Sequence, residues 1–170
     1  MSRVKAVLDG VLRAICVTLF ALLVVLVTWQ VFTRLVLDNP NVWTEEAAKN
    51  VFIWLSLIGI SIATGEKADV VMDFLVRKLP VAGQRVTESL AYLATIAFVL
   101  VVMVWGGWHQ ASMAWHQTHP VLPLTAGQLY LAVPVAGVLM GLYLLYHLAK
   151  TLTPSWAGIP DIDPEEEVEV

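Results

Sequence analysis

Histidines are the residues of this sequence whose type most readily binds a metal ion or a haem. His109, His116 and His119 lie in one segment, and His147 lies in a later apolar stretch. A haem inside a membrane needs axial ligands from different helices at matching depth. The charge pattern described below places His147 at the opposite membrane face from the other three. We therefore expect surface histidines, with no cofactor and no metal in this chain, and keep a histidine-based redox anchor as an alternative.

A second group of ionisable side chains opens an apolar run. Glu45, Glu46 and Lys49 follow Trp43 and Thr44, and Thr44 is a candidate N-cap of a helix. Glu45 and Lys49 stand four residues apart, the spacing at which helical side chains pair. Ionisable groups at membrane depth usually have a partner. These residues are therefore predicted to meet a partner subunit or lipid headgroups.

Other chemistry-bearing motifs are missing from the sequence. It contains no phosphate-binding glycine loop, no dinucleotide fingerprint, no HExxH and no nucleophile elbow. Cys16 is the single cysteine, so no disulfide framework can form within the chain. The first apolar stretch has no carboxylate in its interior, which a proton-coupled transporter of this size would need. We predict that the chain is not an enzyme, and an independent small transporter stays as a further alternative.

Four apolar stretches must position these residues. They cover about 14–37, 44–65, 86–115 and 126–150, in a chain with 58% hydrophobic and 14% charged residues. About 20 apolar helical residues cross a bilayer, so the sequence predicts an all-α membrane protein with four transmembrane helices. The first stretch is too long for a cleaved signal and is expected to remain as an anchor. Residues 1–152 form the transmembrane domain, and residues 153–170 form an acidic tail that is predicted to be disordered.

A short amphipathic segment at 69–79 lies between the second and third stretches. Asp69, Asp73 and Arg77 recur every four residues on one helical face, and apolar residues fill the other. Asp73 and Arg77 can pair at this spacing. The segment is too short to span the membrane, so it is predicted to be an interfacial helix in the cytoplasmic plane of the bilayer.

Lysine and arginine are distributed unequally among the connections. Positive residues resist crossing the membrane, so loops rich in them stay in the cytoplasm. No lysine or arginine occurs between residues 38 and 44 or between residues 109 and 128. They gather before the first helix, between the second and third helices, and after the fourth, although Arg34 and Lys49 lie on the helix ends that flank residues 38–44. Both termini are therefore predicted to be cytoplasmic.

Small residues recur on two of the stretches. Gly59 lies on the second, and Gly137 and Gly141 stand four apart on the fourth, where they allow helices to approach closely. Together with the groups above they define a candidate partner or lipid interface. Its members are Trp43, Glu45, Glu46, Lys49, Trp54, Gly59, Asp73, Arg77, Gly137 and Gly141.

Three local patterns, in this order and spacing, are similar to those of a known family. They are Trp43-Thr44-Glu45-Glu46 with Phe52-Ile53-Trp54-Leu55 and Gly59, then Val70-Val71-Met72-Asp73-Phe74-Leu75 leading to Leu79-Pro80, and Leu129-Tyr130-Leu131-Ala132-Val133-Pro134 with Gly137 and Met140. On these patterns the chain resembles the small membrane subunit of tripartite ATP-independent periplasmic (TRAP) transporters, the DctQ-like or Q subunit. It departs from the family at Asp69, where many members carry a histidine, so no role of that histidine is carried over.

The resemblance implies a partner rather than a catalyst. It implies a large membrane subunit that carries the substrate and sodium sites, and a periplasmic binding protein that delivers the solute. The chain itself would be a scaffold in the bacterial inner membrane, surrounded by the lipid bilayer and without nucleic acid. The implied process is sodium-coupled uptake of an organic acid such as a C4-dicarboxylate or a sialic acid.

Overall fold

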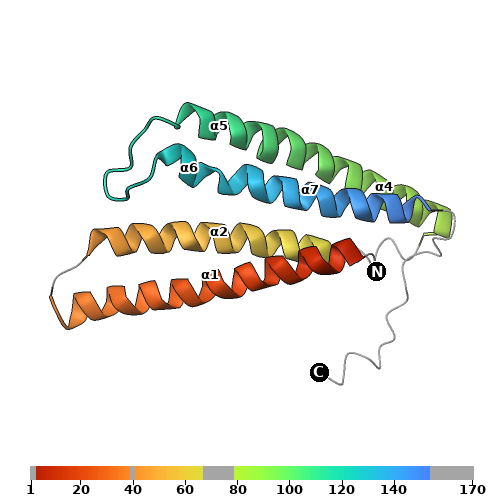
Figure 1. Ribbon diagram of the computed structural model, residues 1–170. Helices are drawn as coiled ribbons and strands as arrows, with labels where there is room; N and C mark the ends of the chain where they lie inside the picture. The colour runs from red at the N-terminus through yellow and green to blue at the C-terminus, as the bar shows by residue number, and fades with distance from the viewer. Residues whose placement is uncertain (1–2, 39–40, 67–78, 154–170) are drawn as a thin grey trace, which may run out of the picture.

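Helices account for nearly all of the described structure. The computed structural model describes residues 3–38, 41–66 and 79–153 (Figure 1). Its helical segments are α1 (Arg3–Leu35), α2 (Val42–Glu66), α4 (Val81–Phe98), the π-helix η1 (Val99–Gly106), α5 (Gly107–Met113), α6 (Ala126–Tyr130) and α7 (Ala132–Thr151). Because α4, η1 and α5 run on without a gap, and α6 leads into α7, these segments build longer helices.

Four of these helices are long and apolar enough to cross a membrane. They are Lys5–Leu35, Val42–Glu66, Val81–Met113 and Ala126–Thr151. The predicted all-α class with four potential spans is thereby confirmed. The fourth span is interrupted at Leu131, because Pro134 has no N–H to offer the carbonyl of Tyr130 and cannot continue a regular helix through it.

Some predicted boundaries differ from the structure. α1 begins at Arg3 rather than near residue 14, and the third span begins at Val81 rather than near residue 86. α2 begins at Val42, so the prediction of Thr44 as the N-cap is wrong. Thr44 lies inside the first turn, where its hydroxyl donates to the carbonyl of Asn41 at 2.7 Å. α1 starts earlier because Lys5, Asp9 and Arg13 in its first turns contact α2 and α7. The third span starts earlier because α4 begins directly after Pro80, its N-cap.

Two predicted segments lie outside the described residues. Apart from their end residues, the interfacial helix at 69–79, with Asp73 and Arg77, and the acidic tail at 153–170 fall within 67–78 and 154–170. Both remain predictions.

The four spans lie side by side in the order α1, α2, α7 and α4–η1–α5 (Figure 1). α1 packs on α2, α2 packs on α7, and α7 packs on η1 and α4. α2 and α7 are therefore the central helices, and α1 and the third span form the two edges. Following the predicted topology, we call the end with Val42 and Thr125 the outer end and the opposite end the inner end.

Two small apolar clusters hold this layer together on the two sides of α7. Leu12, Ile58 and Tyr143 form one between α1, α2 and α7, and Ile96, Val99 and Leu144 form the other between the third span and α7. Most remaining apolar side chains point outward. Only 6% of the most apolar window of α1 is buried, against 39% for the span that contains α7. Such a surface is stable in lipid and unstable in water.

Candidate partner interface and the polar clusters at its two ends

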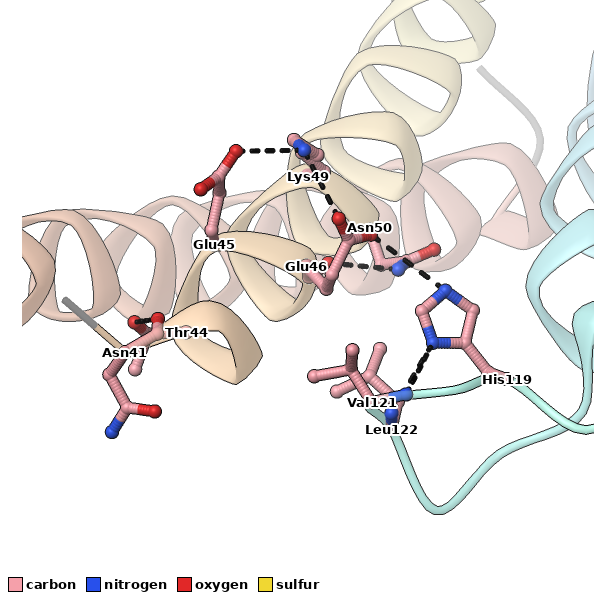
Figure 2. Close-up of polar contacts among 9 residues, drawn as sticks. All are labelled: Asn41, Thr44, Glu45, Glu46, Lys49, Asn50, His119, Val121 and Leu122. Carbon is pink, nitrogen blue, oxygen red and sulfur yellow. Dashed lines mark hydrogen bonds and ion pairs between the residues drawn. The ribbon is translucent and has the colours of Figure 1, made fainter.

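The predicted pairing of Glu45 with Lys49 is confirmed at the outer end of α2. The Lys49 ammonium lies 2.9 Å from the Glu45 carboxylate and 3.1 Å from that of Glu46 (Figure 2). The side chains of Glu45 and Lys49 remain 50% and 56% exposed. An exposed pair of this kind adds little stability. The pair therefore leaves both groups accessible to a partner or to lipid headgroups.

Glu46 also reaches across to the loop between α5 and α6. Its Oε2 lies 3.7 Å from Nε2 of His119, whose side chain is only 18% exposed (Figure 2). The other ring nitrogen, Nδ1, accepts the backbone N–H groups of Val121 at 3.4 Å and Leu122 at 3.3 Å. A nitrogen that accepts carries no proton, so the neutral ring has its proton on Nε2, which faces Glu46. His119 is thus only partly exposed, and its ring contacts both its own loop and α2.

The other histidines occupy different surroundings. His109 and His116 are exposed as predicted, and the ring of His109 stacks on Trp105 with centroids 6.1 Å apart. His147 is buried at the inner end of α7, so the prediction of a surface histidine is wrong for this residue, because its imidazole contacts the last turn of α2 instead of facing outward. Within residues 3–38, 41–66 and 79–153, no group of three His, Cys, Asp or Glu side chains is placed to hold a metal ion.

A second polar cluster at the inner end was missed by sequence reasoning. Lys5 Nζ donates to the carbonyl oxygen of Gly65 at 2.9 Å, and His147 Nε2 lies 3.0 Å from the same oxygen. A carbonyl only accepts, so this histidine nitrogen carries a proton. The last carbonyls of a helix lack donors within it and form its negative end. Lys5 of α1 and His147 of α7 therefore supply hydrogen-bond donors to a carbonyl in the last turn of α2.

Two further contacts join α1 to its neighbours at this end. Tyr143, only 2% exposed, donates its phenol O–H to Asp9 at 2.5 Å, and Arg13 pairs with Glu66 at 2.5 Å. The spacing of Lys5, Asp9 and Arg13, four residues apart, was the available signal in the sequence. It predicts one helical face but does not show what that face meets.

Replacing Tyr143 with phenylalanine should lower the free energy of unfolding of the chain by about 2 kcal/mol, since a hydrogen bond to a charged group is worth about 1.5–3 kcal/mol. Unfolding by SDS in mixed micelles measures this. Tyr146→Phe is the matched control. It also removes a phenol O–H but keeps the ring, whose centroid lies 5.5 Å from Lys5 Nζ. Equal losses in both variants would contradict the role given to the Asp9 contact.

The structure separates the predicted interface residues into outward-facing and inward-facing groups. Trp43 is exposed, and a Cβ added to Gly59 would meet nothing within 4 Å. Trp54 packs against the cluster around Ile58. A Cβ on Gly137 would lie 2.8 Å from that of Met103, and one on Gly141 would lie 3.9 Å from Val99. Gly137 and Gly141 thus serve packing of α7 on the third span.

Three glycines at tight packing sites were not singled out from the sequence. A Cβ on Gly65 would lie 2.7 Å from the ring of Tyr143, and one on Gly107 would lie 2.9 Å from Pro134. At Gly127 it would lie 2.5 Å from the backbone oxygen of Ala111. Their neighbours come from other helices, so only the three-dimensional arrangement identifies them.

A shallow groove of about 370 Å³ opens between the third and fourth spans. Its lining is almost entirely apolar and includes Val104, Trp108, Leu131, Pro134, Val135, Val138 and Leu139. Organic acids are recognised by positive or hydrogen-bonding groups. This groove therefore fits hydrocarbon, from lipid or from another helix, better than a carboxylate solute.

Residues 23–153 match the family described as tripartite ATP-independent periplasmic transporters, DctQ component. The chain belongs to this family. The resemblance inferred from the local sequence patterns is confirmed, and this DctQ component is a multi-pass membrane protein of TRAP transporters. The matched residues include the outer cluster around Glu46 and His119. Lys5, Asp9 and Arg13 precede them, so the contacts of α1 at the inner end lie outside the matched part.

Relatives of this DctQ component agree with the family match. It is 28% identical over 145 residues to a Haemophilus influenzae protein assigned as a TRAP transporter small permease, covering 85% of this chain and 89% of that protein. It is 26% identical over 140 residues to the sialic acid TRAP transporter small permease SiaQ of Vibrio cholerae, covering 82% and 80%. It also matches 17% of the isethionate TRAP transporter permease DctMQ of Oleidesulfovibrio alaskensis, with 31% identity over 110 residues and 64% of this chain covered.

Proposed function

We propose that this small permease subunit is a non-catalytic scaffold that binds and stabilises the large membrane subunit of its transporter. The large subunit would carry the sodium and substrate sites, and a periplasmic binding protein would deliver an organic acid such as a C4-dicarboxylate or a sialic acid. The relatives' names, which include sialic acid and isethionate systems, support this solute class.

The observation that carries the proposal is the single layer of spans. A solute crossing the membrane needs polar groups along a path between helices. In the described part of the chain, the charged side chains gather at the ends of the spans, and the described groove is apolar. A layer with outward-facing apolar side chains instead offers a broad surface to another membrane protein.

The longer relative gives further support for this partnership. A segment similar to this chain makes up 17% of the DctMQ permease protein. Joining two modules in one polypeptide raises the effective concentration of one for the other. Where the two are separate chains, the contact must be maintained by their surfaces alone.

The proposed orientation has both termini in the cytoplasm of a bacterium and the spans in its inner membrane. The positive residues Lys5, Arg13, Arg85 and Lys150 all lie near the inner end of the layer, which the positive-inside rule assigns to the cytoplasm. The interfacial helix at 69–79 would lie against the same membrane face.

The outward face of α2 is the proposed contact surface for the large subunit. Glu45 and Lys49 lie at its outer end, and Gly59 leaves open space farther along the helix. Membrane helices associate where small residues let their backbones approach. An accessible glycine on a central helix of the layer is suited to such an approach.

Replacing Gly59 with leucine should reduce co-purification of the large subunit several-fold and leave the stability of the isolated chain unchanged. A Cβ added there meets nothing of this chain within 4 Å, and the leucine side chain would hold a partner helix away. Tagged pull-down from membranes that contain the whole transporter measures the effect.

Gly10→Leu is the matched control, because Gly10 on α1 also has nothing within 4 Å of an added Cβ. If the Gly10 variant loses the large subunit and the Gly59 variant keeps it, the proposed surface is on the wrong helix. If wild-type chain never captures a large subunit, the scaffold function itself fails.

A further inference from the structure

The layer consists of two helical hairpins joined along one seam. α1 and α2 form the first, and the third and fourth spans form the second (Figure 1). The main helix contact between them is that of α2 with α7. Toward the inner end of this seam, one helical turn before Gly65, the Ser61 hydroxyl lies 3.4 Å from the carbonyl oxygen of Ala136. Helices in lipid associate through packing and polar contacts rather than a hydrophobic driving force, so one seam leaves the hairpins weakly joined.

Each end of this seam carries a histidine that crosses from the second hairpin to the first. At the inner end, His147 of α7 donates to the Gly65 carbonyl in the last turn of α2 at 3.0 Å. At the outer end, His119 of the α5–α6 loop faces Glu46 in the first turns of α2 at 3.7 Å (Figure 2). The two contacts therefore hold opposite ends of the same helix.

His119 can bridge only because its own loop holds the ring in place. The N–H groups of Val121 and Leu122 both point at Nδ1. The loop is ordered further by the N–H of His119, which donates to the Leu124 carbonyl at 3.0 Å, and by the capping box of Thr125 and Gln128 at the start of α6. This arrangement leaves Nε2–H as the group directed at α2.

We propose that His119 and His147 are clasps that fix the relative position of the two hairpins, with His119 ordering its loop through Nδ1 and attracting the Glu46 carboxylate through the dipole of its Nε2–H. The inference deepens the proposed scaffold function, and its consequence for transport rests on that function. A scaffold made of two hairpins keeps a fixed width only if the seam between them is held at both ends. Lys49 and Glu45, beside Glu46, belong to the first hairpin alone and do not cross the seam.

Two substitutions separate the roles of the His119 nitrogens. The Oδ1 atom of asparagine stands as far from Cβ as Nδ1 of histidine, so His119→Asn keeps an acceptor for the loop and loses the contact with Glu46. The amide nitrogen of glutamine reaches about as far as Nε2, so His119→Gln keeps a donor toward Glu46 and loses the loop acceptor. His116→Asn is the matched control, because His116 is exposed in the same segment.

Distances between spin labels on the full chain in lipid nanodiscs test the clasp. With Cys16 replaced by serine, one label pair at Val42 and Met113 reports the outer end, and another at Val7 and Ala149 reports the inner end; all four positions are exposed. His119→Asn should broaden the outer distribution toward longer distances and leave the inner one unchanged. His147→Leu should do the reverse, and His147→Gln, which retains a donor, should restore the inner distribution.

The proposal is overturned if His119→Asn gives the same outer distribution as His116→Asn, or if both label pairs change together, which indicates general unfolding. Lys49→Gln should leave both pairs unchanged, and an outer change equal to that of His119→Asn would also overturn it. These measurements need no large subunit. A failed clasp and a failed scaffold function are therefore distinguishable, since only the second abolishes co-purification.

Discussion

Replacing Gly127 with alanine should lower the free energy of unfolding by about 3 kcal/mol, at the upper end of what overpacking usually costs. The added methyl would lie 2.5 Å from the Ala111 oxygen and 2.7 Å from Cα of Trp115, which are backbone atoms that cannot rotate away. α6 would have to separate from the end of α5. It would then lose the hydrogen bonds from Gly127 N–H to Ala114 at 3.0 Å and from Ala126 N–H to Gln117 at 2.8 Å.

Gly59→Ala is the control for this experiment. It adds the same methyl inside a helix where nothing lies within 4 Å, and alanine is favoured over glycine there by up to about 1 kcal/mol. SDS-induced unfolding of the purified chain should therefore show loss for the first variant and no loss for the second. A Gly127 variant as stable as wild type would show that α6 does not pack on α5 as described.

Proteoliposomes that contain this chain alone should show no uptake of any organic acid, with or without a sodium gradient. The expected difference from the complete transporter is the whole of the activity, because the chain offers a layer of helices and an apolar groove rather than a polar path. Radiolabelled sialic acid and succinate are suitable solutes. Adding the large subunit and the binding protein should restore uptake for the solute of that system.

Empty liposomes and liposomes with the large subunit alone serve as controls. Gradient-driven uptake by this chain alone would overturn the scaffold function and favour an independent small transporter. A haem absorbance band in the purified chain would instead favour the redox-anchor alternative. His147 would then have to exchange its contact with the Gly65 carbonyl for a bond to iron.

The inner cluster adds a feature that precedes the family match. Lys5 and Asp9 on α1 meet Gly65 and Tyr143 on the two central helices, before the first matched residue at 23. The N-terminal turns of α1 are thereby part of the frame, although their charge density excludes them from the apolar span expected at 14–37. Removing them would take away a donor to the end of α2 as well as the acceptor of Tyr143.

The sequence by itself determined the features that depend on local spacing. Bilayer thickness sets the length of an apolar helix, so four spans were predictable from the lengths of the four apolar stretches. A separation of four residues places Glu45 beside Lys49 whatever surrounds the helix. The family was recognisable for the same reason, because short motifs keep their order and spacing along the chain.

Only the tertiary structure decided which spans are neighbours. Helices in a membrane are apolar toward lipid and toward each other, so hydrophobic periodicity does not distinguish a buried face from an exposed one. Gly59 and Gly127 look alike in sequence, yet one faces open space and the other faces the backbone of α5. His119 and His147 likewise gained their partners, Glu46 and Gly65, from contacts between segments far apart in the chain.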